Sequence, residues 1–143
     1  MELNTHFIGK TTELLVATEF LKRGYQVSQP LVSDSRYDFI IDINDKLLRF
    51  QVKTSHSEDD NSYIIFATSS SHTNTERTIN KSYSADEIDY FVTYYGGQCY
   101  VISVNEAANR YQRLRFKPPK NGNQKNIKFA ENYTLDKFLE TLI

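Results

Sequence analysis

The sequence predicts an α/β domain in which a mixed central β-sheet is flanked by helices. Three observations support this prediction: a helix-like segment at 5–23, two β-hairpin patterns at 37–53 and 91–104, and an amphipathic segment at 134–142. The chain of 143 residues, 39% of them hydrophobic, is long enough to bury one continuous core. Because no segment has the composition of a linker, we expect residues 1–143 to form a single domain.

The first predicted helix runs from near Thr5 to Arg23, and Gly24 supplies a stop signal just beyond it. A short strand from Tyr25 to Gln29 follows and is ended by Pro30. The expected buried face of the helix is apolar and consists of Leu14, Ala17, Phe20 and Leu21.

A β-hairpin is predicted from Tyr37 to Lys53, because two strand-like runs are separated there by Asn44 and Asp45. A two-residue loop pairs residues whose numbers add to 89 across the two strands. Since side chains alternate along a strand, one face of this hairpin is wholly apolar and is expected to be buried. Its members are Phe39, Ile41, Ile43, Leu48, Phe50 and Val52.

The opposite face of the hairpin is predicted to bring an acid, an amide and an ammonium group together. In this register Asp38 falls opposite Gln51, and Lys53 projects from the same face two residues further on. A three-residue loop would slip the register and separate Asp38 from Gln51. The solvated side of an ordinary amphipathic sheet would also carry residues of these types.

The atoms of these side chains suit metal-assisted phosphodiester hydrolysis. The Asp38 carboxylate, the Gln51 amide oxygen and the Val52 carbonyl form a partial oxygen shell of the kind that holds Mg²⁺, with Mn²⁺ as the alternative. The Lys53 ammonium can orient or help deprotonate an attacking water, or offset charge that builds in the transition state. We therefore predict a catalytic site at the end of this hairpin.

The arrangement resembles the PD-(D/E)XK nuclease superfamily, in its resolvase-like branch. Asp38 matches the acid at the start of one strand, and the run from Gln51 to Lys53 matches the acid-or-amide, any residue, lysine motif of the next. Gly9 and Glu13 match the Gly...Glu pattern of the helix that precedes the hairpin in small resolvase-like members. The departure is Gln51, where most members carry Glu or Asp. This variant is similar to that of bacterial intron-encoded homing endonucleases.

The resemblance implies a restriction-endonuclease-like core and a Mg²⁺-dependent endonuclease that acts on double-stranded DNA. Glu13 would join Asp38, Gln51 and Lys53 in catalysis and could contribute to the metal site. We rank a site-specific homing endonuclease first, and a Holliday junction resolvase or restriction-type endonuclease second. A hypothesis of another class is a catalytically silent DNA-binding module, because the missing carboxylate at Gln51 weakens metal binding.

The middle of the chain changes character after a β-rich run. Ser62 to Ala67 is expected to be a buried strand that extends the same sheet. The polar segment from Ser69 to Tyr83 is expected to be a long functional loop, in which Arg77 and Lys81 contact a DNA backbone. A floppy surface loop is the alternative. The spacing of Ser84 to Glu87 predicts a capping box that starts a short helix.

A second hairpin is predicted from Phe91 to Val104, with Gly96 and Gly97 at its turn. The segment from 134 to 142 is expected to form a terminal amphipathic helix. The apolar face of that helix consists of Leu135, Phe138, Leu139 and Leu142.

A basic stretch lies between residues 111 and 128, although the whole chain has a net charge of −1. We expect its first five basic residues to contact DNA phosphates, and Asn121 and Gln124 to reach base edges. A solvated basic surface would have the same composition. The stretch contains no acid and six basic residues, Arg113, Arg115, Lys117, Lys120, Lys125 and Lys128.

The size of the chain also bears on its partners. One small subunit cannot span a long DNA site, so we expect a homodimer or homotetramer in which each site cuts one strand. The single cysteine, Cys99, lies in an apolar run and is expected to be a buried hydrophobic residue in a reducing cytoplasm. We expect no membrane association, because no stretch approaches the roughly 18 apolar residues of a spanning helix.

Overall fold

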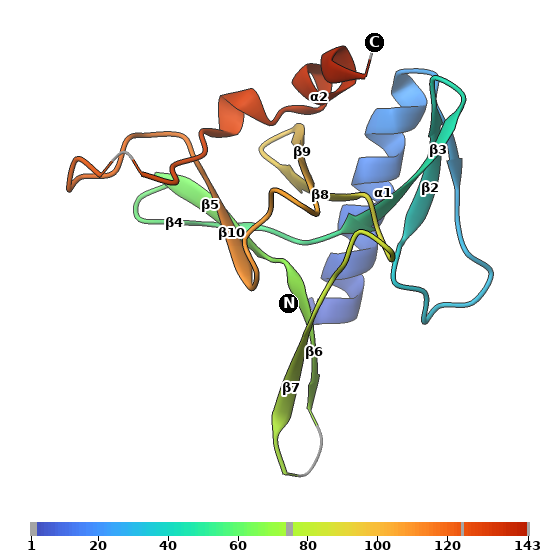
Figure 1. Ribbon diagram of the computed structural model, residues 1–143, viewed down its shortest axis with the longest axis horizontal. Coiled ribbons are helices and arrows are strands. Elements are labelled where there is room, and N and C mark those ends of the chain that lie inside the picture. The colour runs from blue at the N-terminus through green and yellow to red at the C-terminus, as the bar shows by residue number, and fades with distance from the viewer. Residues whose placement is uncertain (1–2, 74–75, 124, 143) are drawn as a thin grey trace.

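A five-stranded mixed sheet lies at the centre of the molecule (Figure 1). The computed structural model describes residues 3–73, 76–123 and 125–142. The strand order is β1-β2-β3-β8-β9, in which β3 and β8 run parallel and the other neighbours antiparallel. The prediction of a mixed sheet is therefore confirmed. The strands are β1 (Gln26–Ser28), β2 (Phe39–Ile43), β3 (Lys46–Val52), β8 (Tyr90–Tyr95) and β9 (Gln98–Ser103).

The first helix, α1 (Thr5–Lys22), forms close to its predicted bounds. The Asn4 side chain caps it by accepting hydrogen bonds from two backbone N–H groups of the first turn. Gly24 ends it with a φ of 85°, a conformation that favours glycine. The predicted buried face was partly wrong, because Leu14 and Leu21 are each 57% exposed. The buried residues are Thr12, Val16 and Phe20.

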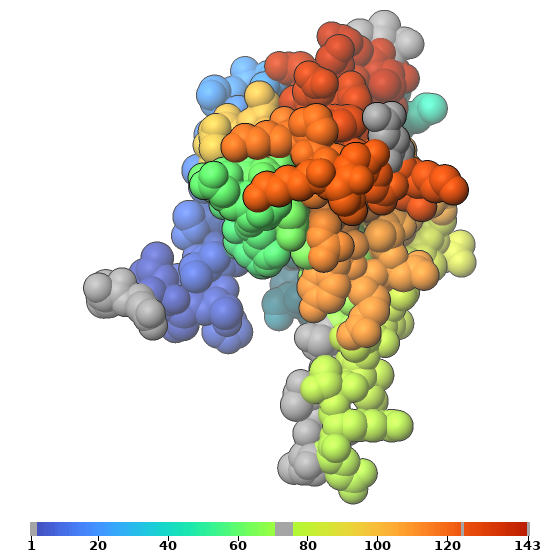
Figure 2. All heavy atoms as spheres, turned by 90° about the vertical axis from the view of Figure 1, so that its left-hand side faces the viewer, coloured from blue at the N-terminus to red at the C-terminus, as the bar shows by residue number. Residues whose placement is uncertain are grey.

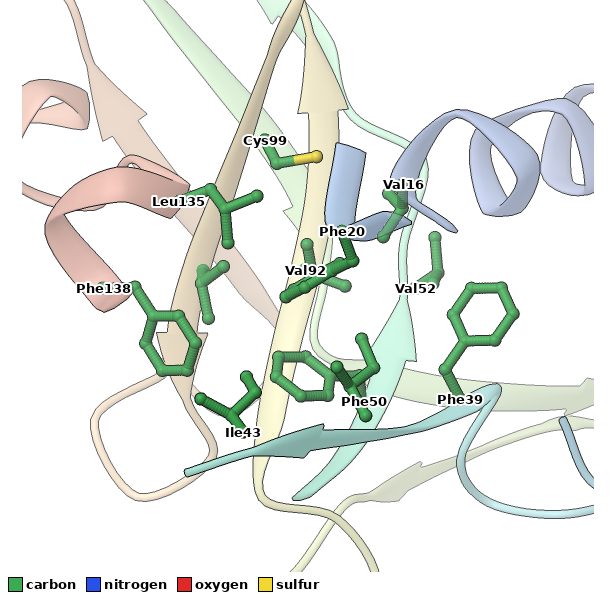
Figure 3. Packing of buried hydrophobic residues seen from close by; sticks show 12 residues of the cluster. Val16, Phe20, Phe39, Ile43, Phe50, Val52, Val92, Cys99, Leu135 and Phe138 are labelled. Carbon is green, nitrogen blue, oxygen red and sulfur yellow. The ribbon is translucent and has the colours of Figure 1, made fainter. Parts of the chain in front are cut away.

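Both helices cover the same face of the central sheet. The second helix, α2 (Leu135–Thr141), is capped by the side chain of Thr134 and forms within the predicted segment. Figure 3 shows residues of both helices packed with the apolar face of the β2–β3 hairpin. The ring of Phe50 lies at the centre, 5.3 Å from that of Phe20 and 6.0 Å from that of Phe138. This packing fixes which face of the hairpin remains available for polar side chains.

A second, three-stranded sheet lies against β8 and β9 from the other side. Its order is β10-β5-β4, formed by β4 (His56–Glu58), β5 (Tyr63–Ala67) and β10 (Tyr111–Arg115). The expectation that Ser62 to Ala67 extends the central sheet was therefore wrong, because β5 pairs with β4 and β10 instead. A short 3-10 helix, η1 (Ala130–Asn132), leads to α2. The core between the two sheets includes Ile64, Phe66, Phe91, Ile102 and Leu114.

The polar segment that follows β5 is a β-hairpin and not a loop. Strands β6 (Ser69–Thr73) and β7 (Thr78–Ser82) pair antiparallel from Ser69↔Ser82 to Thr73↔Thr78. Figures 1 and 2 show this pair projecting from the body as an arm. All five residues of β7 are exposed, so the arm has no core-facing apolar period from which its strands could be predicted. We refer to β6 and β7 as the hairpin arm.

The segment between the arm and β8 forms a turn, and the predicted short helix is absent there. The backbone N–H of Ser84 does donate to Glu87 Oε1 at 3.2 Å, as a capping box requires. The chain then enters the sheet, because the Asp89 N–H donates to the carbonyl of Arg49 at 2.9 Å and β8 begins at the next residue. Across the ranges described, neither α-helix combines the length and apolarity that crossing a membrane requires.

Candidate active site

The β2–β3 hairpin has the register that the sequence predicted. Asn44 and Asp45 form its two-residue turn with φ values of 53° and 65°. The last pair of the ladder is Phe39↔Phe50, so the next residues outward are Asp38 and Gln51. The ladder changes there, because the Val52 N–H donates to Asp38 Oδ2 at 2.8 Å. The carboxylate is thereby held against the end of β3.

Asp38 is a partly buried acid in an unfavourable environment for a charge. The pKa of Asp38 is raised from 3.8 to about 6, chiefly by burial and also by the nearby Glu13 carboxyl. The Val52 N–H and the Lys53 ammonium act in the opposite direction by stabilising the carboxylate. A carboxyl that titrates close to neutrality and lies in a pocket is typical of functional sites.

Glu13 lies in α1 and its side chain comes close to Asp38. Both residues line a pocket of about 290 Å³, together with Lys10 and the loop 29–33. Lys10 Nζ lies 3.4 Å from Glu13 Oε2. The Thr12 hydroxyl is 3.0 Å from that of Thr54, which ties α1 to the chain just beyond β3. The helix is therefore fixed to the hairpin next to the two carboxylates.

Lys53 is partly buried and lies close enough to Asp38 for the two charges to interact. Burial lowers the pKa of Lys53, and the Asp38 carboxylate opposes that change. Lys53 Nζ donates to the Tyr83 hydroxyl at 3.2 Å and to the Ser69 carbonyl at 3.5 Å. Gln51 Nε2 lies 3.4 Å from the Val52 carbonyl oxygen, so the amide sits over the backbone between the two motif residues.

The types of oxygen donor carried by the predicted site residues suit a hard divalent cation. Asp38 and Glu13 supply carboxylates, Gln51 an amide oxygen and Val52 a backbone carbonyl, which are the ligand types that Mg²⁺ and Mn²⁺ accept. The Glu13 carboxyl lies close enough to Asp38 to raise its pKa further, and a cation between two carboxylates would relieve such repulsion. Within the described ranges, no three His, Cys, Asp or Glu side chains cluster as a metal site. Among the described residues, the two carboxyls that meet at this place are those of Glu13 and Asp38.

The basic residues expected to bind DNA lie in two other regions. In β10, Arg113 and Arg115 lie over the ring of Tyr63, with Cζ 5.6 and 5.0 Å from its centroid. Lys120 Nζ lies 3.7 Å from Asp59 Oδ1. Lys117, Asn121 and Lys125 are exposed, and Gln124 lies outside the described residues.

Figure 1 shows that the loop 117–123 and the loop 29–37, which leads into the site, lie at opposite ends of the long axis. One chain therefore does not bring the loop 117–123 next to Asp38. The expected contact of the basic stretch with DNA stays a prediction. In the hairpin arm, Lys81 lies 3.7 Å from Glu87 with its side chain 67% exposed, and Arg77 is exposed just before β7.

Two residues beside Lys53 were missed by sequence reasoning. Arg36 and Tyr83 contact each other, with the guanidinium carbon 3.7 Å from the ring centroid. Tyr83 is the only Phe, Tyr or Trp in the polar segment from 69 to 83, and this was the available signal. Arg36 sits in the Ser-rich loop before β2, where no spacing rule singled it out.

Known proteins share both the sequence pattern and the fold. A family model described as PD-(D/E)XK endonuclease matches residues 3–136. Protein 5.3 of Escherichia phage T7 is 38% identical over 50 residues, which are 35% of this chain and 42% of that protein. The match therefore spans less than half the length of that relative. The bacterial homing endonuclease I-Ssp6803I has a TM-score of 0.80 and 20% identity, over 98% of this chain and 95% of its own.

The family match and the α/β fold place this chain in the class of PD-(D/E)XK endonucleases. Because the family model covers most of its residues, the chain belongs to the PD-(D/E)XK endonuclease family. The resemblance read from Asp38, Gln51 and Lys53 is thereby confirmed, and so is the α/β fold class. The structural likeness to I-Ssp6803I, at 20% identity, concerns the fold alone.

Proposed function

We propose that this protein is a divalent-metal-dependent endonuclease that hydrolyses phosphodiester bonds in double-stranded DNA. The observation that carries the proposal is the meeting of Glu13, Asp38 and Lys53 at the end of the β2–β3 hairpin. The family match supports the reaction class, and the oxygen donors support the cofactor. Residues 1–143 would act as one nuclease domain in the cytoplasm, a location that suits the buried free thiol of Cys99.

Each site residue has a role that follows from its atoms. Asp38 and Glu13 would hold Mg²⁺ or Mn²⁺ by their carboxylates, with Gln51 and the Val52 carbonyl completing the protein's share of the shell. When bound, the cation polarises the scissile phosphate and favours ionisation of water. The Lys53 ammonium stabilises charge on the phosphate oxygens and orients the attacking water. The Val52 N–H keeps the Asp38 carboxylate in place throughout.

The hairpin arm is the surface best suited to enter a DNA groove. A two-stranded β-ribbon fits the major groove, and β7 presents Asn80 and Lys81 from a fully exposed strand. Lys81 and Arg77 suit phosphate contacts, and Asn80 suits base readout. Ser69, the first residue of β6, contacts Lys53, so a duplex bound by the hairpin arm would run close to the candidate site. The basic residues of β10 and the loop 117–125 would contact DNA further away.

A site-specific homing role is the first choice among nuclease activities. It is favoured by Gln51, which matches the glutamine variant, and by an arm with amide and cationic side chains. A junction resolvase would depend on phosphate contacts and branched shape more than on base edges. Comparing cleavage of a four-way junction with cleavage of linear duplex separates the two activities.

We propose a homo-oligomer that assembles through the outer face of α1. Phe7, Leu14 and Leu21 recur every seven residues and are 63%, 57% and 57% exposed. Two hydroxyls on this face, those of Thr11 and Thr18, bond to carbonyls of their own helix, so the face is apolar in character. A second copy packed antiparallel would set Leu14 near the two-fold axis. Two sites, one for each DNA strand, would result.

The candidate from another functional class is a catalytically silent DNA-binding module. It is favoured by the presence of only two carboxylates, Glu13 and Asp38, in the proposed oxygen shell, where Gln51 supplies a neutral amide. The test is incubation with a plasmid library with and without Mg²⁺, followed by mapping of the ends. Mg²⁺-dependent breaks at a defined sequence support the homing proposal. Binding without cleavage, in either Mg²⁺ or Mn²⁺, would support the silent module and contradict the enzyme.

A further inference from the structure

Tyr83 contacts two cationic side chains at the candidate site, those of Lys53 and Arg36. Its hydroxyl accepts a hydrogen bond from Lys53 Nζ at 3.2 Å, and Nζ lies 4.9 Å from the ring centroid. The guanidinium carbon of Arg36 lies 3.7 Å from the same centroid. The ring packs edge-on against Phe91 at 5.4 Å, within the core between the sheets. Tyr83 is therefore a fixed surface for two long, charged side chains.

The same contacts join Lys53 to the root of the hairpin arm, by which we mean Ser69, Ser70, Ser82 and Tyr83. Lys53 Nζ also donates to the Ser69 carbonyl at 3.5 Å. Arg36 Nη1 donates to Ser70 Oγ at 2.9 Å, and Nη2 donates to the Ser82 carbonyl at 3.1 Å. Arg36 forms an ion pair with Glu87 at 2.6 Å on its other side. The root of the hairpin arm is therefore held by hydrogen bonds from two cationic side chains, those of Arg36 and Lys53.

A lysine needs such support because its side chain has four rotatable bonds and a compact charge. The Lys53 ammonium is partly buried, and the Tyr83 hydroxyl and Ser69 carbonyl replace part of its hydration. A group misplaced by about 1 Å can lose on the order of a hundredfold in rate. Removing the Tyr83 ring would allow the Lys53 ammonium to move away from its position.

We propose that Tyr83 is the positioning residue for Lys53, holding the ammonium at the candidate site from the root of the hairpin arm. The inference rests on the proposed function, in which Lys53 acts on the reacting phosphate. Tyr83 itself touches neither the phosphate nor the cation in this mechanism. Its hydroxyl sets the direction of the ammonium, and its ring limits the side chain's freedom.

The first test compares Tyr83→Phe and Tyr83→Leu with the matched control Tyr95→Phe. Tyr95 packs against the same core and its hydroxyl also makes one side-chain hydrogen bond, to Asn61 at 3.4 Å, but its ring stacks on Phe116 and not on Phe91. At saturating protein, we expect single-turnover cleavage to fall about tenfold in Tyr83→Phe and about a hundredfold in Tyr83→Leu. DNA affinity should stay within about twofold, and Tyr95→Phe should cut at the normal rate. A Tyr83→Leu protein that is folded and cuts normally would overturn the inference.

The second test does not depend on cleavage. The Tyr83 ring should cause a ring-current shift of the NMR signals of the Lys53 ε-methylene protons in the free protein, because the Nζ bonded to that methylene lies 4.9 Å from the ring centroid. The shift should persist in Tyr83→Phe and disappear in Tyr83→Leu, with thermal unfolding used to confirm that each variant is folded. If the normal protein cuts no DNA, the proposed function fails while this measurement still decides the contact. Lys53 signals that are identical in all three proteins would overturn the inference.

Discussion

Replacing Asp38 with asparagine should make the protein more stable at neutral pH while removing its activity. In the normal protein the Val52 N–H donates to Asp38 Oδ2 at 2.8 Å. The amide oxygen of an asparagine at this position can accept the same hydrogen bond. The substitution removes a charge that burial and Glu13 disfavour. We expect the variant to gain stability because the Asp38 carboxylate occupies a position that serves the proposed catalysis at a cost in folding free energy.

The magnitude follows from the pKa of Asp38. A pKa of about 6 in the folded protein, against 3.8 ordinarily, corresponds to about 3 kcal/mol of destabilisation when the group is ionised in both states. Because the folded state takes up its proton at the higher pH, this penalty is complete above about pH 6 and disappears as the pH falls to about 4. The unfolding free energy of Asp38→Asn should therefore exceed that of the normal protein by up to about 3 kcal/mol at pH 7.5. Near pH 4 the unfolding free energies of the two proteins should differ only by the effect of exchanging a protonated carboxyl for an amide.

The assay is urea unfolding from about pH 4 to pH 8 in the presence of a chelator. The control is Asp42→Asn, because Asp42 lies in β2, the strand that begins just after Asp38, and its side chain is exposed. Asp42→Asn should leave the pH dependence of the unfolding free energy unchanged. A stability difference between Asp38→Asn and the normal protein that is the same at pH 4 and pH 7.5 would refute the reasoning. Adding Mg²⁺ at pH 7.5 should stabilise the normal protein and not Asp38→Asn.

Three further predictions concern the metal, the DNA and the assembly. Gln51→Glu should bind Mg²⁺ about tenfold more tightly in a metal titration, since it adds a charge with nearly unchanged oxygen geometry; unchanged or weaker binding would mean that Gln51 does not face the metal. Replacing Lys120 and Lys125 with alanine should weaken binding to all duplexes and reduce the salt slope by about two, and an unchanged slope would leave that segment as a solvated surface. Leu14→Glu should give monomers in sedimentation, whereas Leu47→Glu, at a similarly exposed site on β3, should not; oligomers in both variants would exclude the α1 interface.

The candidate site could be predicted where local rules fix geometry. The turn at Asn44 and Asp45 determines the hairpin register, and that register alone brings Asp38 next to the end of β3. Glu13 was harder, because its place depends on how α1 packs on the sheet. The helix has apolar residues on more than one side, so periodicity favoured Leu14 and not the buried face that includes Thr12. The hydrogen bond between Thr12 and Thr54 helps to determine how α1 packs on the sheet. No local sequence pattern predicts this bond.

Elements without a one-sided apolar pattern were placed wrongly for physical reasons. Strand β5 is apolar on both faces, so its sequence indicated burial without indicating which sheet it joins. The hairpin arm is exposed on its second strand and has no apolar alternation, so its sequence favoured a loop. The contacts among Arg36, Lys53 and Tyr83 join three distant segments, and composition alone could not bring them together.

The central claim is that Asp38 and Lys53 act together with a divalent cation to cut DNA. The most direct measurement is single-turnover cleavage of a mapped target by the normal protein and by Lys53→Ala, with Mg²⁺ and with chelator, alongside DNA affinity for both. We predict cleavage only by the normal protein with Mg²⁺, with the affinity of Lys53→Ala within about threefold of normal, since phosphate contacts elsewhere supply most binding. Full activity of Lys53→Ala, or equal cleavage in chelator, would contradict the claim.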